Sequence, residues 1–110
     1  METRKIYGAN DLLPFEPTHP GEVLKEELQS RGFSQKRFAA MIGMSYTALN
    51  EILNSKRSIS VETAMKIEAA LDIEAKLWIN LQSDYNYQIA KRDSGLMACL
   101  QQIRKMAAVL

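Results

Sequence analysis

SQKRFAAMIGMSYTALNEILN, residues 34–54, is the stretch that decides the fold. Ser34 is suited to begin a helix, because its side-chain oxygen can accept a hydrogen bond from a backbone N–H of the first turn. Gly43 suits the left-handed conformation that commonly ends a helix, and Ser45 can begin another helix only two residues later. The spacing predicts two short helices joined by a sharp turn, as in a helix-turn-helix.

Each of the two predicted helices has one apolar face. In the first helix the apolar residues are Phe38, Ala39, Met41 and Ile42. In the second they recur at i, i+3 and i+4, as Leu49, Ile52 and Leu53. The other faces of the second helix are free to contact DNA and carry Tyr46, Thr47, Asn50 and Glu51. An αα-hairpin in an ordinary helical bundle would also contain two short helices, so both interpretations stay open at this point.

Basic residues are concentrated around this motif. The formal net charge of the chain is only +1, which argues against nucleic acid, because much of that affinity comes from neutralising phosphates. Residues 31–57, however, contain five cations and only one carboxylate, Glu51, which gives a local charge of +4. The cations are Arg31, Lys36, Arg37, Lys56 and Arg57. Residues 60–85 are acidic, with five carboxylates against two lysines. A DNA-binding protein needs only one basic face, although any single charge here would also suit a solvated helix surface.

Length and cysteine content favour one cytoplasmic domain. A chain of 110 residues can bury a modest core without metal or disulfides. Cys99 is the single cysteine and has no partner for an intramolecular disulfide, and no apolar run near the start resembles a signal peptide. Every apolar run is shorter than the ~20 residues that span a bilayer, so we expect no membrane segment.

The flanks of the motif divide the chain into three parts. We expect an irregular N-terminal arm at 1–18, a helix-turn-helix domain at 19–92 and a C-terminal helical extension at 93–110. The arm contains two prolines and no sustained period, and its apolar residues either hold it on the domain or form an exposed binding segment: Leu12, Leu13 and Phe15. The extension has an apolar stripe of Leu96, Leu100, Ile103 and Met106. That stripe can dock on its own domain, pair across a dimer or accept another protein.

Three further helices complete the predicted domain. The first spans 21–31, with Pro20 at its start and His19 as its cap, and has Val23, Leu24 and Leu28 facing inward. The second spans 61–71 behind the cap Ser60, with an inward face of Ala64, Ile67, Ala70 and Leu71. The third spans about 74–92, with apolar and aromatic residues Leu77, Trp78, Leu81, Tyr85 and Ile89. All elements are helical, so the sequence predicts an all-α fold.

An enzyme is not indicated by this sequence. It has one histidine, one cysteine, no glycine-rich phosphate loop and no set of ligands at metal-binding spacing. His19 has no visible catalytic partner, which favours a structural role. We therefore expect no catalytic, metal or cofactor site.

Five strings of sequence are distinctive in combination. They are HPGEVLKEEL at 19–28, GFSQKRFAAMIG at 32–43, LNEILNSKRSIS at 49–60, ETAMKIEAALDI at 62–73 and WINLQSDY at 78–85. In these strings the chain resembles the HigA-type antitoxins of the Cro/C1-type (XRE) helix-turn-helix family, over roughly residues 19–89. The resemblance implies a five-helix lambda-repressor-like domain, here with the extra amphipathic helix at 93–110.

The resemblance also implies a function and a set of DNA contacts. Such proteins are usually homodimers, bind a palindromic operator in their own promoter and neutralise a HigB-type toxin, an mRNA-cleaving RNase of the RelE-like fold. The positions that would contact bases are Tyr46, Thr47, Ala48, Asn50 and Glu51. The positions that would contact phosphate are Gln35, Ser45, Lys56 and Arg57. Asn50 suits adenine and Glu51 suits cytosine N4.

Two other functions fit the same residues. The chain could be a stand-alone Cro/C1-type repressor without a toxin partner, or a module in which toxin inhibition dominates and DNA binding is weak. A small basic RNase-like reading frame beside the gene would favour the antitoxin over the stand-alone repressor, and binding to the gene's own promoter would argue against the third possibility.

Overall fold

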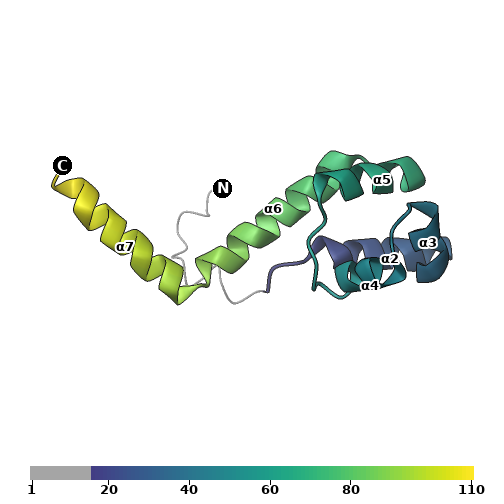
Figure 1. The fold of residues 1–110 in the computed structure, drawn as a ribbon, viewed down its shortest axis with the longest axis horizontal. Helices are drawn as coiled ribbons and strands as arrows, with labels where there is room; N and C mark the ends of the chain where they lie inside the picture. The colour runs from purple at the N-terminus through teal and green to yellow at the C-terminus, as the bar shows by residue number, and fades with distance from the viewer. Residues whose placement is uncertain (1–15) are drawn as a thin grey trace, which may run out of the picture. The chain divides into compact units, whose positions relative to one another are not determined.

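The computed structural model of this protein describes residues 16–110, which form six α-helices and confirm the all-α prediction (Figure 1). The helices are α2 (Pro20–Arg31), α3 (Gln35–Met41), α4 (Tyr46–Leu53), α5 (Val61–Leu71), α6 (Ala75–Lys91) and α7 (Ser94–Ala108). Helices α2 to α6 are the five predicted for the domain, and α7 is the predicted extra helix. The apolar residues of the predicted arm, Leu12, Leu13 and Phe15, lie outside the described residues.

Four of the helices begin at the residues that the sequence predicts. The side-chain oxygens of Ser34, Ser45 and Ser60 each accept a hydrogen bond from the backbone N–H three residues further on. At the start of α2, Nδ1 of His19 accepts from the N–H of Gly21 at 2.8 Å. These bonds satisfy backbone donors that a first helical turn leaves unpaired.

His19 has the structural role that its lack of a catalytic partner suggested. The ring is buried and meets the ring of Tyr85 edge to face, with centroids 4.7 Å apart. Burial lowers the pKa of His19 below its usual range, an effect that the nearby carboxylate of Glu22 partly opposes. Because Nδ1 accepts a hydrogen bond, the neutral ring carries its proton on Nε2.

One hydrophobic core joins α2, α3, α4, α5 and the first part of α6. Its largest completely buried apolar members are Trp78, Phe38, Leu24, Leu49, Ile52 and Ile67. The loop between α4 and α5 contributes Ile59, whose backbone N–H donates to Oε1 of the buried Gln82 on α6 at 2.8 Å. The core therefore fixes both ends of α4, because the helices before it and the loop after it pack into the same cluster.

Some apolar residues of the predicted helices lie outside the core. Met41 of α3 and Leu77 of α6 are 48% and 44% exposed, and Ile89 near the end of α6 is also exposed. Val23 and Ala70, which were predicted to face inward, are half-buried and pack against the core. These residues flank their apolar stripes, where a neighbouring helix covers the centre of the stripe but not its edge.

Contacts divide the chain into two units, which are described separately. Thr18–Tyr85 is one unit, and Asn86–Leu110 belongs to the other. In the second unit Oδ1 of Asp93 accepts from the N–H of Leu96 and caps α7. No side chain of α7 is buried, and Ile103 and Met106 of its predicted apolar stripe are more than half exposed. The predicted domain boundary at residue 92 remains a prediction.

No helix within residues 16–110 combines the length and the apolar character that crossing a membrane requires.

Candidate nucleic-acid interface

The turn between α3 and α4 has the geometry that the sequence predicts. Gly43 has φ of +69°, in the left-handed region where glycine has no Cβ to clash. The N–H of Met44 donates back to the carbonyl of Ala39, and Ser45 then begins α4. Helix α4 packs against both α2 and α3 through Leu49, Ile52 and Leu53. Its opposite side is left toward solvent.

The approach of α2 to α4 depends on Gly21. A Cβ placed on Gly21 would overlap the backbone carbonyl oxygen of Ile52. A side chain at this position would force the two helices apart. Gly21 therefore sets how deeply α4 is seated in the domain, which in turn sets how far its outer face projects.

The five side chains predicted to contact bases differ in exposure. Tyr46 and Thr47 are exposed, whereas Ala48, Asn50 and Glu51 are half-buried. Tyr46 also lines an open hollow together with Ser34, Gln35 and Lys36 of the α3 N-terminus. The structure thus brings the starts of α3 and α4 to one surface.

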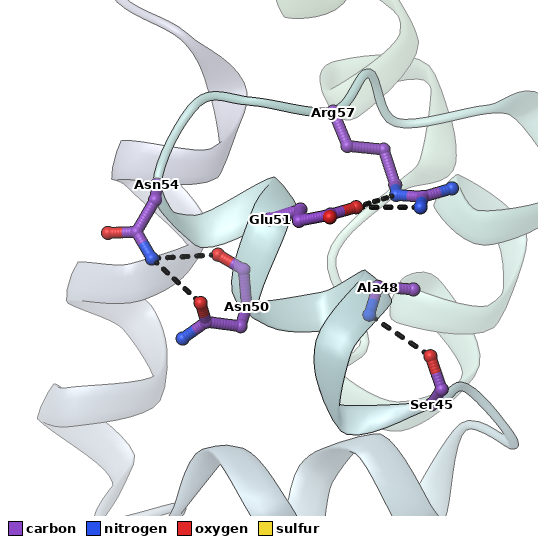
Figure 2. Close-up of polar contacts among 6 residues, drawn as sticks. All are labelled: Ser45, Ala48, Asn50, Glu51, Asn54 and Arg57. Atoms are coloured by element: carbon purple, nitrogen blue, oxygen red, sulfur yellow. Dashed lines mark hydrogen bonds and ion pairs between the residues drawn. The ribbon is translucent and has the colours of Figure 1, made fainter.

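Asn50 of α4 is hydrogen-bonded to the start of α3 and to the residue that follows α4. Its Nδ2 donates to Oε1 of Gln35 at 3.0 Å. Its Oδ1 and its backbone carbonyl both accept from Nδ2 of Asn54, at 3.2 and 2.9 Å (Figure 2). Each amide atom of Asn50 that has a protein partner keeps a second hydrogen-bonding position, because a carboxamide has two N–H donors and two acceptor lone pairs. Gln35 and Asn50, assigned to phosphate and base contacts, are therefore direct neighbours.

Glu51 is paired with Arg57. Oε1 of Glu51 lies 2.8 Å from Nε and 2.6 Å from Nη2 of Arg57 (Figure 2). Arg57 belongs to the loop that follows α4, and the remaining predicted phosphate residue of that loop, Lys56, is exposed. A predicted base-contacting residue and a predicted phosphate-contacting residue thus form one ion pair on the surface.

The side chain of Ser45 caps α4 and uses one of its hydrogen-bonding positions to do so. Its Oγ accepts from the N–H of Ala48 at 3.0 Å, so the hydroxyl proton is the part of the side chain left for an outside acceptor (Figure 2). Ala48 has no polar side-chain atom and can offer only apolar contact, for instance to a thymine methyl.

Asn54 lies beside the predicted base-contacting residues and was not among them. It is exposed, it follows Thr47 by seven residues and so lies on the same side of α4, and it bonds to Asn50. The i, i+4 spacing of two asparagines was the signal that could have identified it. Among residues 16–110, no group of His, Cys, Asp or Glu side chains is arranged to hold a metal ion.

Comparison with known proteins identifies the motif independently. The helix-turn-helix family model matches residues 24–78. Virulence-associated protein I of Dichelobacter nodosus is 34% identical over 76 residues, which are 68% of this chain and 70% of that protein.

Two solved structures are similar in both fold and sequence. The Pseudomonas aeruginosa antitoxin HigA, solved with the higBA promoter, is 32% identical, with a TM-score of 0.70 over 74% of this chain and 90% of that one. An addiction module antidote protein of the HigA family from Coxiella burnetii is also 32% identical, with a TM-score of 0.70 over 83% of this chain and 95% of that one.

Proposed function

Because the chain belongs to the Cro/C1-type helix-turn-helix family, we propose that it is a DNA-binding antitoxin that represses its own promoter and neutralises a toxin. One observation carries this proposal: a HigA antitoxin that shares the fold at 32% identity was solved with its promoter. The polar face of α4, which the core leaves open, supports it. The local charge of +4 over residues 31–57 supports a phosphate-rich partner.

We propose two sets of DNA contacts, one to bases and one to phosphates. Tyr46, Thr47, Ala48, Asn50 and Glu51 lie on the side of α4 that enters the major groove. We assign the phosphate contacts to residues around this face, which are Gln35, Ser45, Lys56 and Arg57. A homodimer would place two copies of α4 about 34 Å apart, which is one turn of DNA and explains a palindromic operator.

The proposed protein partner is a HigB-type toxin, an RNase of the RelE-like fold. The support is the similarity to HigA-family antidote proteins, which covers most of both chains. The promoter lies in the cytoplasm, so we place the protein there, and we propose no catalytic activity of its own. The alternative is a stand-alone repressor, and the two differ in whether a toxin gene lies beside this one.

A footprint and a mobility shift on the gene's own promoter test DNA binding. We expect full-length protein to protect a palindrome there and to bind random DNA much more weakly. Asn50→Ala should weaken operator binding by roughly five- to a hundredfold, since a good base contact discriminates by about 1–3 kcal/mol. Lys56→Ala should weaken binding to both DNAs alike. Equal loss on both DNAs from Asn50→Ala would contradict its assignment to a base.

Co-expression with the neighbouring reading frame tests the toxin. We expect the two products to purify together and expect mRNA cleavage by the partner to stop when this chain is present. Operator binding without any such complex would leave the stand-alone repressor as the function.

A further inference from the structure

Arg57 belongs to a loop, but its guanidinium lies against α4. After α4 the chain turns back at Ser55, which has φ of +63°, and the N–H of Lys56 donates to the backbone carbonyl of Glu51 at 2.7 Å. The side chain of Arg57 then extends over the helix to the carboxylate of Glu51 (Figure 2). A cation from outside the helix is thereby presented beside residues of the face that we propose enters the groove.

The pair leaves the outer edge of the guanidinium available. Arginine has five N–H donors, and the carboxylate oxygen of Glu51 lies within hydrogen-bonding distance of Nε and Nη2. The remaining donors are both N–H groups of Nη1 and one of Nη2, and the Arg57 side chain is 51% exposed. Two of these donors are parallel and point away from Glu51. This is the fork that matches the O6 and N7 acceptors of guanine in the major groove.

The charge of the pair favours a base over a phosphate. Glu51 neutralises much of the attraction that Arg57 would have for the DNA backbone, so the pair is poorly suited to a phosphate contact. A fixed orientation, by contrast, is what a bidentate base contact requires. If Glu51 left Arg57 to accept from cytosine, its carboxylate would stand unneutralised among phosphates. Lys56, the neighbouring cation, carries no such fork and suits a phosphate as a point charge.

We infer that Arg57 contacts the major-groove edge of a guanine in the operator and that Glu51 is a positioning residue that orients its guanidinium. The inference rests on the proposed operator binding and changes two sequence-based assignments. Arg57 becomes a source of sequence specificity, and Glu51 acts through Arg57 without itself contacting a base.

The test replaces each guanine of the footprinted operator in turn with 7-deazaguanine, which lacks the N7 acceptor. For the full-length wild-type chain we expect one position per half-site to lose roughly five- to a hundredfold in affinity. Arg57→Ala should bind the unmodified operator more weakly and be insensitive to 7-deazaguanine at that position, and Arg57→Lys should also bind more weakly, because an ammonium lacks the planar fork. Lys56→Ala is the matched control, and it should lose affinity for all DNAs but keep the wild-type sensitivity.

Glu51→Ala distinguishes positioning from direct contact. We expect it to lower the ratio of operator to random-DNA affinity and to lose the same 7-deazaguanine sensitivity, while its affinity for random DNA stays equal or rises. The double variant Glu51→Ala/Arg57→Ala should show no larger loss of the ratio than either single variant. Thermal unfolding of each variant checks that the exposed pair is not needed for folding. Arg57→Lys serves as a second check, because it keeps the positive charge beside Glu51.

Three outcomes separate failure of this inference from failure of the proposed function. If wild-type protein prefers the operator but Arg57→Ala behaves like Lys56→Ala, Arg57 contacts phosphate and the inference is overturned. If the losses from Glu51→Ala and Arg57→Ala multiply in the double variant, Glu51 contacts DNA independently and the inference is again overturned. If wild-type protein shows no preference for any promoter segment, the proposed operator binding fails, and this inference fails with it.

Discussion

Thr18–Tyr85 and helix α7 both have amphipathic sequences, but only the first region buries its apolar side chains. Leu24, Phe38 and Trp78 are completely buried in the first region, whereas Ile103 and Met106 of α7 are 54% and 61% exposed. An apolar repeat therefore predicts which face of a helix can be buried, but not whether anything in the same chain covers it. Packing should stabilise the first region, and local capping should matter most for α7.

The largest contrast is expected from removing a large side chain in each region. Phe38→Ala should lower the free energy of unfolding by about 3–5 kcal/mol, because it leaves a cavity in a fully packed site. Ile103→Ala should change it by no more than about 0.5 kcal/mol, since its side chain is already exposed. Urea denaturation followed by circular dichroism measures both. A large effect of Ile103→Ala that grows with protein concentration would show that another copy covers α7.

Glycine-to-alanine substitutions should differ in size between the two regions. Gly21→Ala should destabilise the protein by about 1–3 kcal/mol, because the new Cβ would overlap the backbone of Ile52. Gly95→Ala should change the stability of α7 by less than about 1 kcal/mol, because alanine favours helix but its Cβ would lie 3.3 Å from Oδ1 of Asp93, the atom that caps α7. The thermal midpoint and the helical signal report the two effects. If Gly21→Ala changed stability as little as Gly95→Ala, the close approach of α2 and α4 would not be what requires glycine at position 21.

Acid should weaken the first region through His19, the only histidine in the chain. Its pKa is lowered by burial, so the unfolded chain binds the proton more tightly than the folded chain does. The stability that the neutral ring contributes is present above the unfolded pKa, near 6.5, and is lost as the pH falls toward the lower folded pKa. One proton can change the free energy of unfolding by at most about 1.4 kcal/mol per pH unit.

Urea midpoints between pH 7.5 and 5 test this titration. His19→Asn is the matched control, because its side-chain oxygen can still cap α2 but does not titrate. The variant should lose the part of the pH dependence that the wild type shows below about pH 6.5. An unchanged slope would mean that His19 is not the group responsible.

The smallest contrast is expected at the helix caps. Ser45→Ala and Asp93→Ala should each remove about 1 kcal/mol of local helix stability. Only Ser45→Ala should lower the global free energy of unfolding, because α4 is part of the packed core, whereas Asp93→Ala should reduce helicity before global unfolding begins. Amide hydrogen exchange separates the two. Loss of global stability with Asp93→Ala would show that α7 folds together with the core.

Features that depend on neighbouring residues were predictable from the sequence. The caps at His19, Ser34, Ser45 and Ser60 involve atoms two or three residues apart, and all four are present. The turn at Gly43 is local in the same sense. The core side of α4 also followed from its spacing, because a narrow stripe on a short helix leaves few alternatives.

Features that depend on distant contacts were not predictable in this way. Burial of Gln82 follows from its bond to the backbone of Ile59, 23 positions earlier, and the requirement for glycine at 21 follows from the backbone of Ile52. Met41 was expected on the apolar face of its helix, but it is 48% exposed.

The candidate interface shows the same limit. The polar side of α4 could be located from the spacing of the core residues, but the hydrogen bonds and the ion pair within the interface could not. Gln35 meets Asn50 across the helix-turn-helix, and Arg57 meets Glu51 only because the loop turns back at Ser55. Sequence identified the residues one by one, whereas their pairing required the three-dimensional arrangement.

The burial of Trp78 also provides a built-in optical reporter. It is the single tryptophan of the chain and is completely enclosed by the core of Thr18–Tyr85. Its fluorescence should emit at short wavelength in the folded chain and shift to the red when that core opens to water. Since the indole lies on α6 and not on the exposed side of α4, the emission wavelength reports the integrity of the core without interference from DNA at the candidate interface.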